Sequence, residues 1–227
     1  MTFAFVLVCT VAACFALRNP LKACPPAFYA LAVAVDAAYL AAGAWEMPWD
    51  VWVALFLLVQ KCLLPLALFT VVMYVGVLPQ ESRPHRWLKA VRAELSIVAW
   101  ILSLGHMAAY LASYAPRIAQ GGPVNLNVAS SFALALVLLA LLLVLGFTSF
   151  NAVKRRMHAD AWKKVQRLAY PFFALTYAHL LLMLGPSAVR GNDAAVASVA
   201  VYSVVFLGYF ALRTLRWALD RRARAAD

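Results

Sequence analysis

The sequence predicts an all-α, polytopic membrane protein, a bundle of helices that crosses the bilayer several times. Of its 227 residues, 66% are apolar and 13% are charged, whereas soluble domains have about 45–50% apolar and about 25% charged residues. The mean hydropathy is +0.82. Apolar residues form long runs separated by short connectors that are basic or rich in turn residues. Helices are expected in these runs, because a spanning segment in lipid must satisfy its own backbone.

Seven runs predict seven transmembrane helices, since about 20 apolar residues cross the hydrocarbon core. The first, residues 1–17, is the shortest, and Arg18-Asn19-Pro20 ends it. No positive residue precedes it, so we expect a membrane helix rather than a signal peptide. The other predicted spans are 26–45, 50–78, 93–114, 128–150, 165–184 and 194–215. Pro65 predicts a kink in the third span. We therefore expect a six-helix core and one additional N-terminal helix.

The basic residues predict how these spans are oriented. With the N-terminus outside, the predicted cytoplasmic segments hold 17 of the 20 lysines and arginines, and such an excess orients membrane proteins. We therefore expect the N-terminus outside and the C-terminus in the cytoplasm. Topology explains the formal charge of +11, and we expect no nucleic-acid partner. The four cysteines form no C-x-x-C-H motif, so the sequence gives no support for covalent c-type haem attachment.

Two histidines lie inside predicted spans at matching depth. His106 follows Glu94 by 12 residues and His179 follows Gln166 by 13, which places them about 18 and 20 Å from the cytoplasmic side. Both spans run in the same direction. Two imidazoles facing each other across a bundle can be the axial ligands of a haem iron, and they can equally form a proton relay. The residues alone leave both interpretations open.

The neighbours of the two histidines fit haem binding. Gly105 is small and would let a macrocycle approach the backbone. Ser103 and Thr176 each precede a histidine by three residues. Either hydroxyl could accept a hydrogen bond from a ring N–H and so fix the tautomer of a ligand.

Asp36 and Lys61 are the other charged residues predicted inside the membrane, both about 14–16 Å from the outer surface. A lone charge there would be costly, so we expect a structural ion pair between them. The alternative is a functional site: a proton relay, or a polar lining for a quinone head group to which Gln60 contributes.

Three stretches resemble the ferric reductase-like transmembrane domain family, in particular the branch of the haem-binding membrane subunit of the bacterial periplasmic methionine sulfoxide reductase system. They are 92–96 leading to Leu104-Gly105-His106, then Phe147-Thr148-Ser149, then 162–170 leading to His179. The resemblance covers roughly residues 60–217. It implies a multi-pass protein of a bacterial cytoplasmic membrane that carries electrons through b-type haem, with His106 and His179 as ligands.

Gln166 departs from the family pattern, which commonly has a histidine there as ligand of a second haem. We therefore expect one haem b near the outer face and no complete inner site. The cytoplasmic surface would then be about 20 Å away, so a donor within the membrane is expected, either a quinol such as menaquinol or a flavin such as FMN. The acceptor would be an extracytoplasmic redox partner protein.

The predicted domains follow: a two-helix segment (1–50), the haem-binding bundle (51–217) and a basic cytoplasmic tail (218–227). With no soluble nicotinamide or flavin domain evident, the chain is expected to act as the electron-transfer subunit of a membrane oxidoreductase. Two alternatives stay open. One is a haem-free transporter or scaffold that uses Asp36, Lys61 and the histidines for protons or substrate. The other is an anchor for a partner dehydrogenase, in which any haem is structural.

Overall fold

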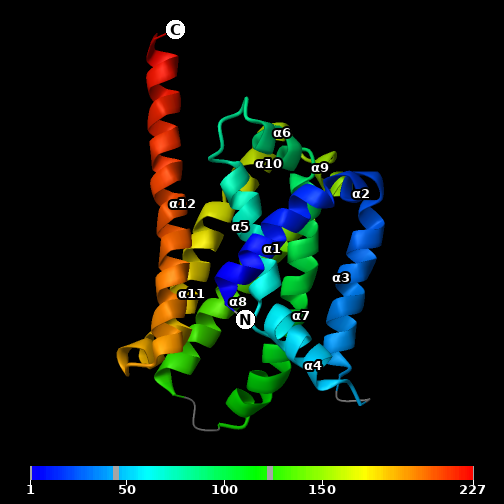
Figure 1. Cartoon of the computed structure of the whole chain (residues 1–227), viewed down its shortest axis with the longest axis vertical. Helices are drawn as coiled ribbons and strands as arrows, with labels where there is room; N and C mark the ends of the chain where they lie inside the picture. Colours follow the sequence, from blue (N-terminus) through cyan, green and yellow to red (C-terminus); the bar gives the residue numbers. More distant parts are fainter. Residues whose placement is uncertain (1, 43–45, 122–124, 227) are drawn as a thin grey trace.

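The computed structural model describes residues 2–42, 46–121 and 125–226, and every regular element within them is a helix (Figure 1). The predicted fold class, an all-α multi-pass membrane protein, is confirmed at this level. Residues 43–45, at the predicted end of the second span, and residues 122–124, in a predicted loop, lie outside the described residues.

The helices follow one another with short connections. The first part of the chain forms α1 (Phe3–Ala16), α2 (Arg18–Ala23), α3 (Pro25–Leu40), α4 (Trp49–Leu55), the π-helix η1 (Phe56–Gln60), α5 (Leu63–Val75) and α6 (Arg83–Lys89). The second part forms α7 (Arg92–Ala119), α8 (Leu126–Ser149), α9 (Asn151–Lys154), α10 (Ala159–Gln166), α11 (Ala169–Val189) and α12 (Asp193–Ala226). In Figure 1, α12 extends beyond the rest of the bundle toward the C-terminus.

Among the described residues, four segments are long and apolar enough to cross a membrane: Arg92–Ala119, Leu126–Ser149, Ala159–Val189 and Asp193–Arg222. Trp49–Gln60 with Leu63–Val75 makes a fifth if the 44° bend between them lies within one span. α1 and α3 are apolar but have only 14 and 16 residues, fewer than the roughly 17–25 of a typical span. The count of seven spans and the orientation of the termini therefore stay predictions.

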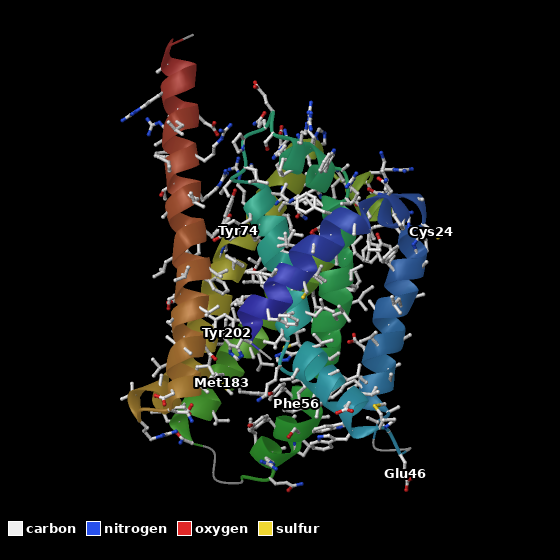
Figure 2. The ribbon with its side chains drawn as sticks, viewed as in Figure 1. Cys24, Glu46, Phe56, Tyr74, Met183 and Tyr202 are labelled. Carbon is white, nitrogen blue, oxygen red and sulfur yellow. The ribbon has the colours of Figure 1, made fainter. Side chains whose placement is uncertain are left out.

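Helix α1 runs obliquely across α5 rather than alongside it (Figure 1). Its first residue, Phe3, packs on Tyr202 of α12 with ring centroids 4.7 Å apart, a contact near the labelled Tyr202 in Figure 2. Near its other end, Phe15 packs edge-on against Trp87 of α6 at 6.2 Å. α1 thus connects α12 to α6 across the surface of the bundle.

The third predicted span is broken at Lys61 and Cys62. The Lys61 N–H donates to the Phe56 carbonyl, five residues back, and Cys62 has φ +56°, in the left-handed region. Pro65 explains the position of the break, because a proline ring clashes with the carbonyl four residues before it, here that of Lys61. The kink predicted from Pro65 is therefore present, displaced one turn toward the N-terminus. Within the described backbone, no N–H group donates to the Gln60 carbonyl.

Helix α8 packs against both α7 and α11, and α5 packs against α7. Gly146 of α8 allows one of these contacts, because a Cβ built there would overlap the indole of Trp100 on α7. α11 is anchored to α12 by the fully buried rings of Phe173 and Phe206, whose centroids are 4.3 Å apart. The Tyr74 hydroxyl of α5 donates to the Val205 carbonyl of α12 at 2.8 Å. Close packing of this kind holds membrane helices together, since lipid gives no hydrophobic drive between them.

Candidate functional site

The imidazole of His106 is fixed by the break between η1 and α5. Its Nδ1 lies 2.6 Å from the Gln60 carbonyl oxygen. A carbonyl can only accept, so Nδ1 carries the proton and Nε2 keeps its lone pair free. The ring also lies against Tyr110, one turn further along α7, with centroids 4.9 Å apart. His106 is thus held in the tautomer that a metal-ligating histidine needs.

His179 lies on α11, and its ring is close enough to that of His106 for the two to interact electrostatically. Its Nδ1 is buried without a hydrogen-bond partner among the described residues. The backbone carbonyl of Ser131, on α8, faces the ring. The two histidines predicted from their depth therefore come from different helices to one region of the bundle, and α8 packs against both of those helices.

The hydroxyls expected to orient these rings have other partners. Ser103 donates to the Ala99 carbonyl and Thr176 to the Phe172 carbonyl, each at 2.8 Å. A hydroxyl in a helix reaches the carbonyl one turn back on its own helix, which competes with contacts across the bundle. The prediction for Ser103 is wrong, because the Gln60 carbonyl takes that role for His106. For Thr176, no hydrogen bond to His179 exists in the described structure.

Gly105 of α7 lies against Asp36 of α3. A Cβ built on Gly105 would overlap the carboxylate of Asp36, which occupies the space that this glycine leaves. Asp36 itself is buried, and its Oδ1 has no hydrogen-bond partner in the described part of the chain. Gly105 thus allows α3 to approach α7 beside His106, and its predicted role toward a macrocycle stays a prediction.

The ion pair predicted between Asp36 and Lys61 is not formed. The salt bridges among the described residues are Lys163–Asp160 and Arg216–Asp220. Lys61 is exposed, and its ammonium lies over the Phe56 ring, 5.2 Å from the centroid. The break next to Cys62 turns Lys61 outward, so equal depth along two helices did not bring the two charges together.

Polar groups nevertheless gather behind His106. The Tyr39 hydroxyl donates to the Gln60 side-chain oxygen, so Gln60 binds through its amide as well as through its carbonyl. The Cys62 thiol lies beside Ser103 and within electrostatic reach of Asp36. The predicted site of Asp36 and Gln60 therefore stays beside His106, without Lys61.

Gln166, at the end of α10, is engaged by protein. Its side-chain nitrogen donates to the Thr148 hydroxyl at 3.0 Å, and Trp162 Nε1 donates to the Thr148 carbonyl at 2.9 Å. This pairing ties α10 to the end of α8. No imidazole stands at this position.

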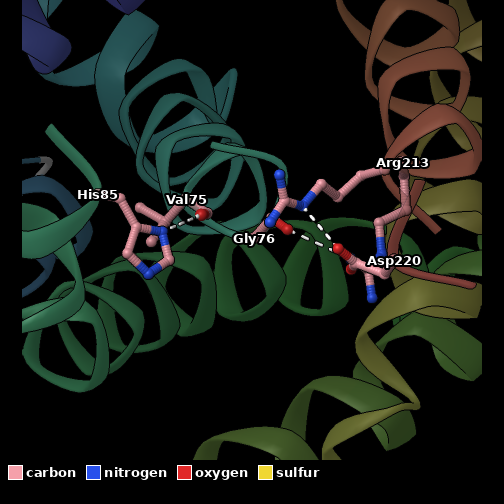
Figure 3. A network of polar contacts seen from close by, with 6 residues as sticks. Val75, Gly76, His85, Arg213 and Asp220 are labelled. Carbon is pink, nitrogen blue, oxygen red and sulfur yellow. Dashed lines mark hydrogen bonds and ion pairs between the residues drawn. The ribbon is translucent and has the colours of Figure 1, made fainter. Parts of the chain in front are cut away.

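The other two histidines differ from each other. His158 is exposed, as a connector residue should be. His85, expected to be solvated as well, is buried: its Nδ1 lies 3.0 Å from the Val75 carbonyl at the end of α5, where Arg213 donates to the Gly76 carbonyl at 3.2 Å (Figure 3). Both side chains cap carbonyls that a helix end leaves free. His85 Nε2 has no hydrogen-bond partner among the described groups. Because His158 is exposed, these two histidines do not form a second buried pair that could bind a haem iron.

The donor set decides which metal centre the region can hold. The described residues contain no group of three or more His, Cys, Asp and Glu side chains that could bind a bare metal ion. A haem needs only two axial ligands from protein, because the porphyrin supplies the others. His106 and His179 fit this requirement: the bond from Nδ1 of His106 to the Gln60 carbonyl leaves its other ring nitrogen for a ligand, and Nδ1 of His179 has no hydrogen-bond partner among the described residues.

Comparison with known proteins supports a redox role. The family model "Ferric reductase like transmembrane component" matches residues 58–177, which include Gly105, His106 and Gln166 and end two residues before His179. A protein of Treponema pallidum (strain Nichols), described only as uncharacterized, is 42% identical over 160 residues, covering 70% of this chain and 44% of that protein. The chain thus spans less than half the length of this relative. No solved structure matches it.

Proposed function

Because the chain belongs to the ferric reductase-like transmembrane component family, we propose that it is the electron-transfer subunit of a membrane oxidoreductase, with one b-type haem held between His106 and His179. A haem bound there would supply a one-electron Fe(III)/Fe(II) couple. Electrons would enter from a donor within the membrane and leave to an extracytoplasmic redox partner protein.

The observation that supports this proposal most is the state of the two imidazoles. Both come from membrane helices to one region; His106 bonds through Nδ1 to the Gln60 carbonyl, and Nδ1 of His179 has no hydrogen-bond partner among the described residues. Two imidazoles with uncommitted nitrogens are what the axial positions of one haem iron require. The Gln60 carbonyl holds His106 in the tautomer that carries its proton on Nδ1 and can ligate through Nε2.

Gln166 supports a single haem. Its amide already donates to Thr148, and an amide is not a usual haem ligand. Without a second haem nearer the cytoplasm, a soluble cytoplasmic donor would be far from the proposed iron. We therefore propose a quinol such as menaquinol, or a flavin such as FMN, as the electron donor.

The buried carboxylate of Asp36, beside His106, is the group we assign to a proton or to the quinone head group, together with Gln60. Asp36→Asn keeps the shape of the side chain and removes its charge. We expect the folded protein to bind haem and to lose quinol-dependent haem reduction at least tenfold. Reduction at the wild-type rate in a fully folded variant would eliminate this role.

The experiment for the main proposal uses the full chain purified in detergent. We expect a Soret band, and a reduced-minus-oxidised spectrum of b type, in the wild type and in His158→Ala, which removes an exposed histidine. His106→Ala and His179→Ala should each lose the pigment while staying folded by circular dichroism. A colourless wild type would favour the haem-free transporter or scaffold instead.

A further inference from the structure

An apolar cavity of about 340 Å³ lies between the first helices of the chain and the helices behind them. α1 packs on α5, α3 packs on α7, and the short helix α2 connects α1 to α3. From α2 the two helices diverge (Figure 1), and the cavity is the groove between them. Its walls come from α1, α2, α3, η1, α5 and α7, and none of the described residues that line it is charged.

The length of the groove matches one leaflet of a bilayer. It follows α1 from Phe5 to Leu17, and these 12 residues extend about 18 Å along the helix. Half of a hydrocarbon core about 30 Å thick is about 15 Å. Because α1 runs obliquely (Figure 1), the groove stays within about that depth. Its volume is that of a site for one flexible chain, since an α-helix of another protein would be about 10–12 Å across.

Basic side chains lie at the end of the groove where α2 closes it. Leu17 and Leu21 line the cavity, and each is followed in the sequence by a basic residue, Arg18 and Lys22. Lys22 is exposed. The Arg18 guanidinium lies over the Trp87 ring, 4.4 Å from its centroid, and tryptophan is enriched at the interface between membrane and water. Two positive charges next to apolar walls are complementary to a molecule with an apolar chain and an anionic head.

We propose that the groove binds one acyl chain of an anionic phospholipid, whose phosphate is held by Arg18 and Lys22. The charges favour this occupant over a neutral lipid, because each basic residue near an anionic surface contributes about fivefold in affinity. Glu94 carries the opposite charge at this end, but it lies within electrostatic reach of Tyr29 on α3, away from α2. The lipid would fill the space between α1 and α3, and its binding does not depend on the proposed haem.

The headgroup is tested with the full chain in mixed micelles that contain equal amounts of phosphatidylglycerol and phosphatidylcholine. Native mass spectrometry should show one retained phosphatidylglycerol per chain. The double variant Arg18→Gln and Lys22→Gln should lower the preference for phosphatidylglycerol about thirtyfold. The control is Arg155→Gln with Lys164→Gln, which removes two exposed charges from another connector and should leave the preference unchanged. A wild type that retains both lipids equally, or neither, would overturn the proposal.

The chain site is tested by filling the groove. Ala13 lines the cavity whereas its neighbour Ala12 does not, so Ala13→Phe should abolish lipid retention and Ala12→Phe should not. Equal retention in the two variants would overturn the proposal. If Ala13→Phe does not fold, the wild type decides through its cysteines. Cys9 and Cys24 are both exposed, and only Cys9 lines the groove. Phosphatidylglycerol should slow alkylation of Cys9 by N-ethylmaleimide more than that of Cys24, and equal slowing would contradict a chain in the groove.

Discussion

Gln166 and His179 lie on one segment of the chain, Ala159–Val189, and both face α8, yet they are treated differently. The Gln166 amide donates to the hydroxyl of Thr148 at one end of α8. Thirteen residues further along, the His179 ring lies near the Ser131 backbone carbonyl, and its Nδ1 has no hydrogen-bond partner in the described structure. At the level of Gln166, which we call the closed level, the polar side chain is hydrogen-bonded by protein. At the level of His179, a ring nitrogen is left without a hydrogen-bond partner among the described residues.

The difference shows how a redox site can be distinguished from a packing contact. A polar side chain whose hydrogen bonds are made by protein stabilises the fold and has no ligand to bind. A buried imidazole with an uncommitted nitrogen is costly unless something binds it. In a family whose motif commonly has histidines at both positions, the closed level explains why we expect one haem rather than two.

The largest effect is expected from Phe173→Ala, between the two levels. Phe173 is fully buried, and its ring packs on Phe206 and Tyr209 of α12. Loss of the ring should lower the free energy of unfolding by about 3–5 kcal/mol, measured as a lower melting temperature in detergent. The contacts of both Gln166 and His179 with α8 should weaken together. Leu207→Ala, on the exposed face of α12, should change stability by less than about 0.5 kcal/mol. Equal effects would mean that α11 is not anchored through Phe173.

Gly105→Ala tests what lies beside His106. The added Cβ would overlap the Asp36 carboxylate, and overpacking of this kind costs about 1–3 kcal/mol. Thermal unfolding should show the loss, and Asp36→Ala in the same chain should restore part of it. Gly185→Ala is the control, since a Cβ there meets nothing within 4 Å. If Gly105→Ala alone were as stable as the wild type, the close approach of α3 to α7 would be disproved.

Pro65→Ala tests why the Gln60 carbonyl, which orients His106, is free of a backbone hydrogen bond among the described residues. Residue 65 would regain its N–H and lose its clash with the Lys61 carbonyl, so α5 could extend backward and engage the Gln60 carbonyl. We expect haem retention to fall about tenfold, measured by dilution or transfer to apomyoglobin. Pro186→Ala, at a proline inside α11, should leave retention unchanged. If both variants retained haem equally well, the break at Pro65 would not be the cause of the orientation of His106.

The smallest effect is expected at the closed level. Gln166→Ala removes one hydrogen bond to Thr148 and should cost about 1 kcal/mol or less, with the haem content and spectrum of the wild type. Loss of pigment on this change would contradict the assignment of Gln166 as a packing residue.

The sequence was sufficient to predict the helical membrane fold and the family. These depend on long apolar runs and on the spacing within a motif, which are local properties. It was not sufficient for the partners of the rings. The acceptor for His106 is a backbone carbonyl, which residue type does not reveal, although Pro65 predicts that carbonyls nearby will lack donors.

The remaining errors have a common physical cause. Asp36 and Lys61 were matched by depth, but depth does not determine which way a side chain points, and the break beside Cys62 turns Lys61 outward. Ser103 was matched by its spacing from His106, but its hydroxyl bonds to its own helix.

The haem-to-protein ratio of the purified full chain, from the pyridine haemochrome spectrum and quantitative amino-acid analysis, tests the central claim most directly. We expect one haem per chain, because His106 and His179 are the two histidines in the membrane helices and Gln166 stands where a further ligand would be. A ratio of two would show that the level of Gln166 also holds a haem, and a ratio near zero would show that His106 and His179 hold none.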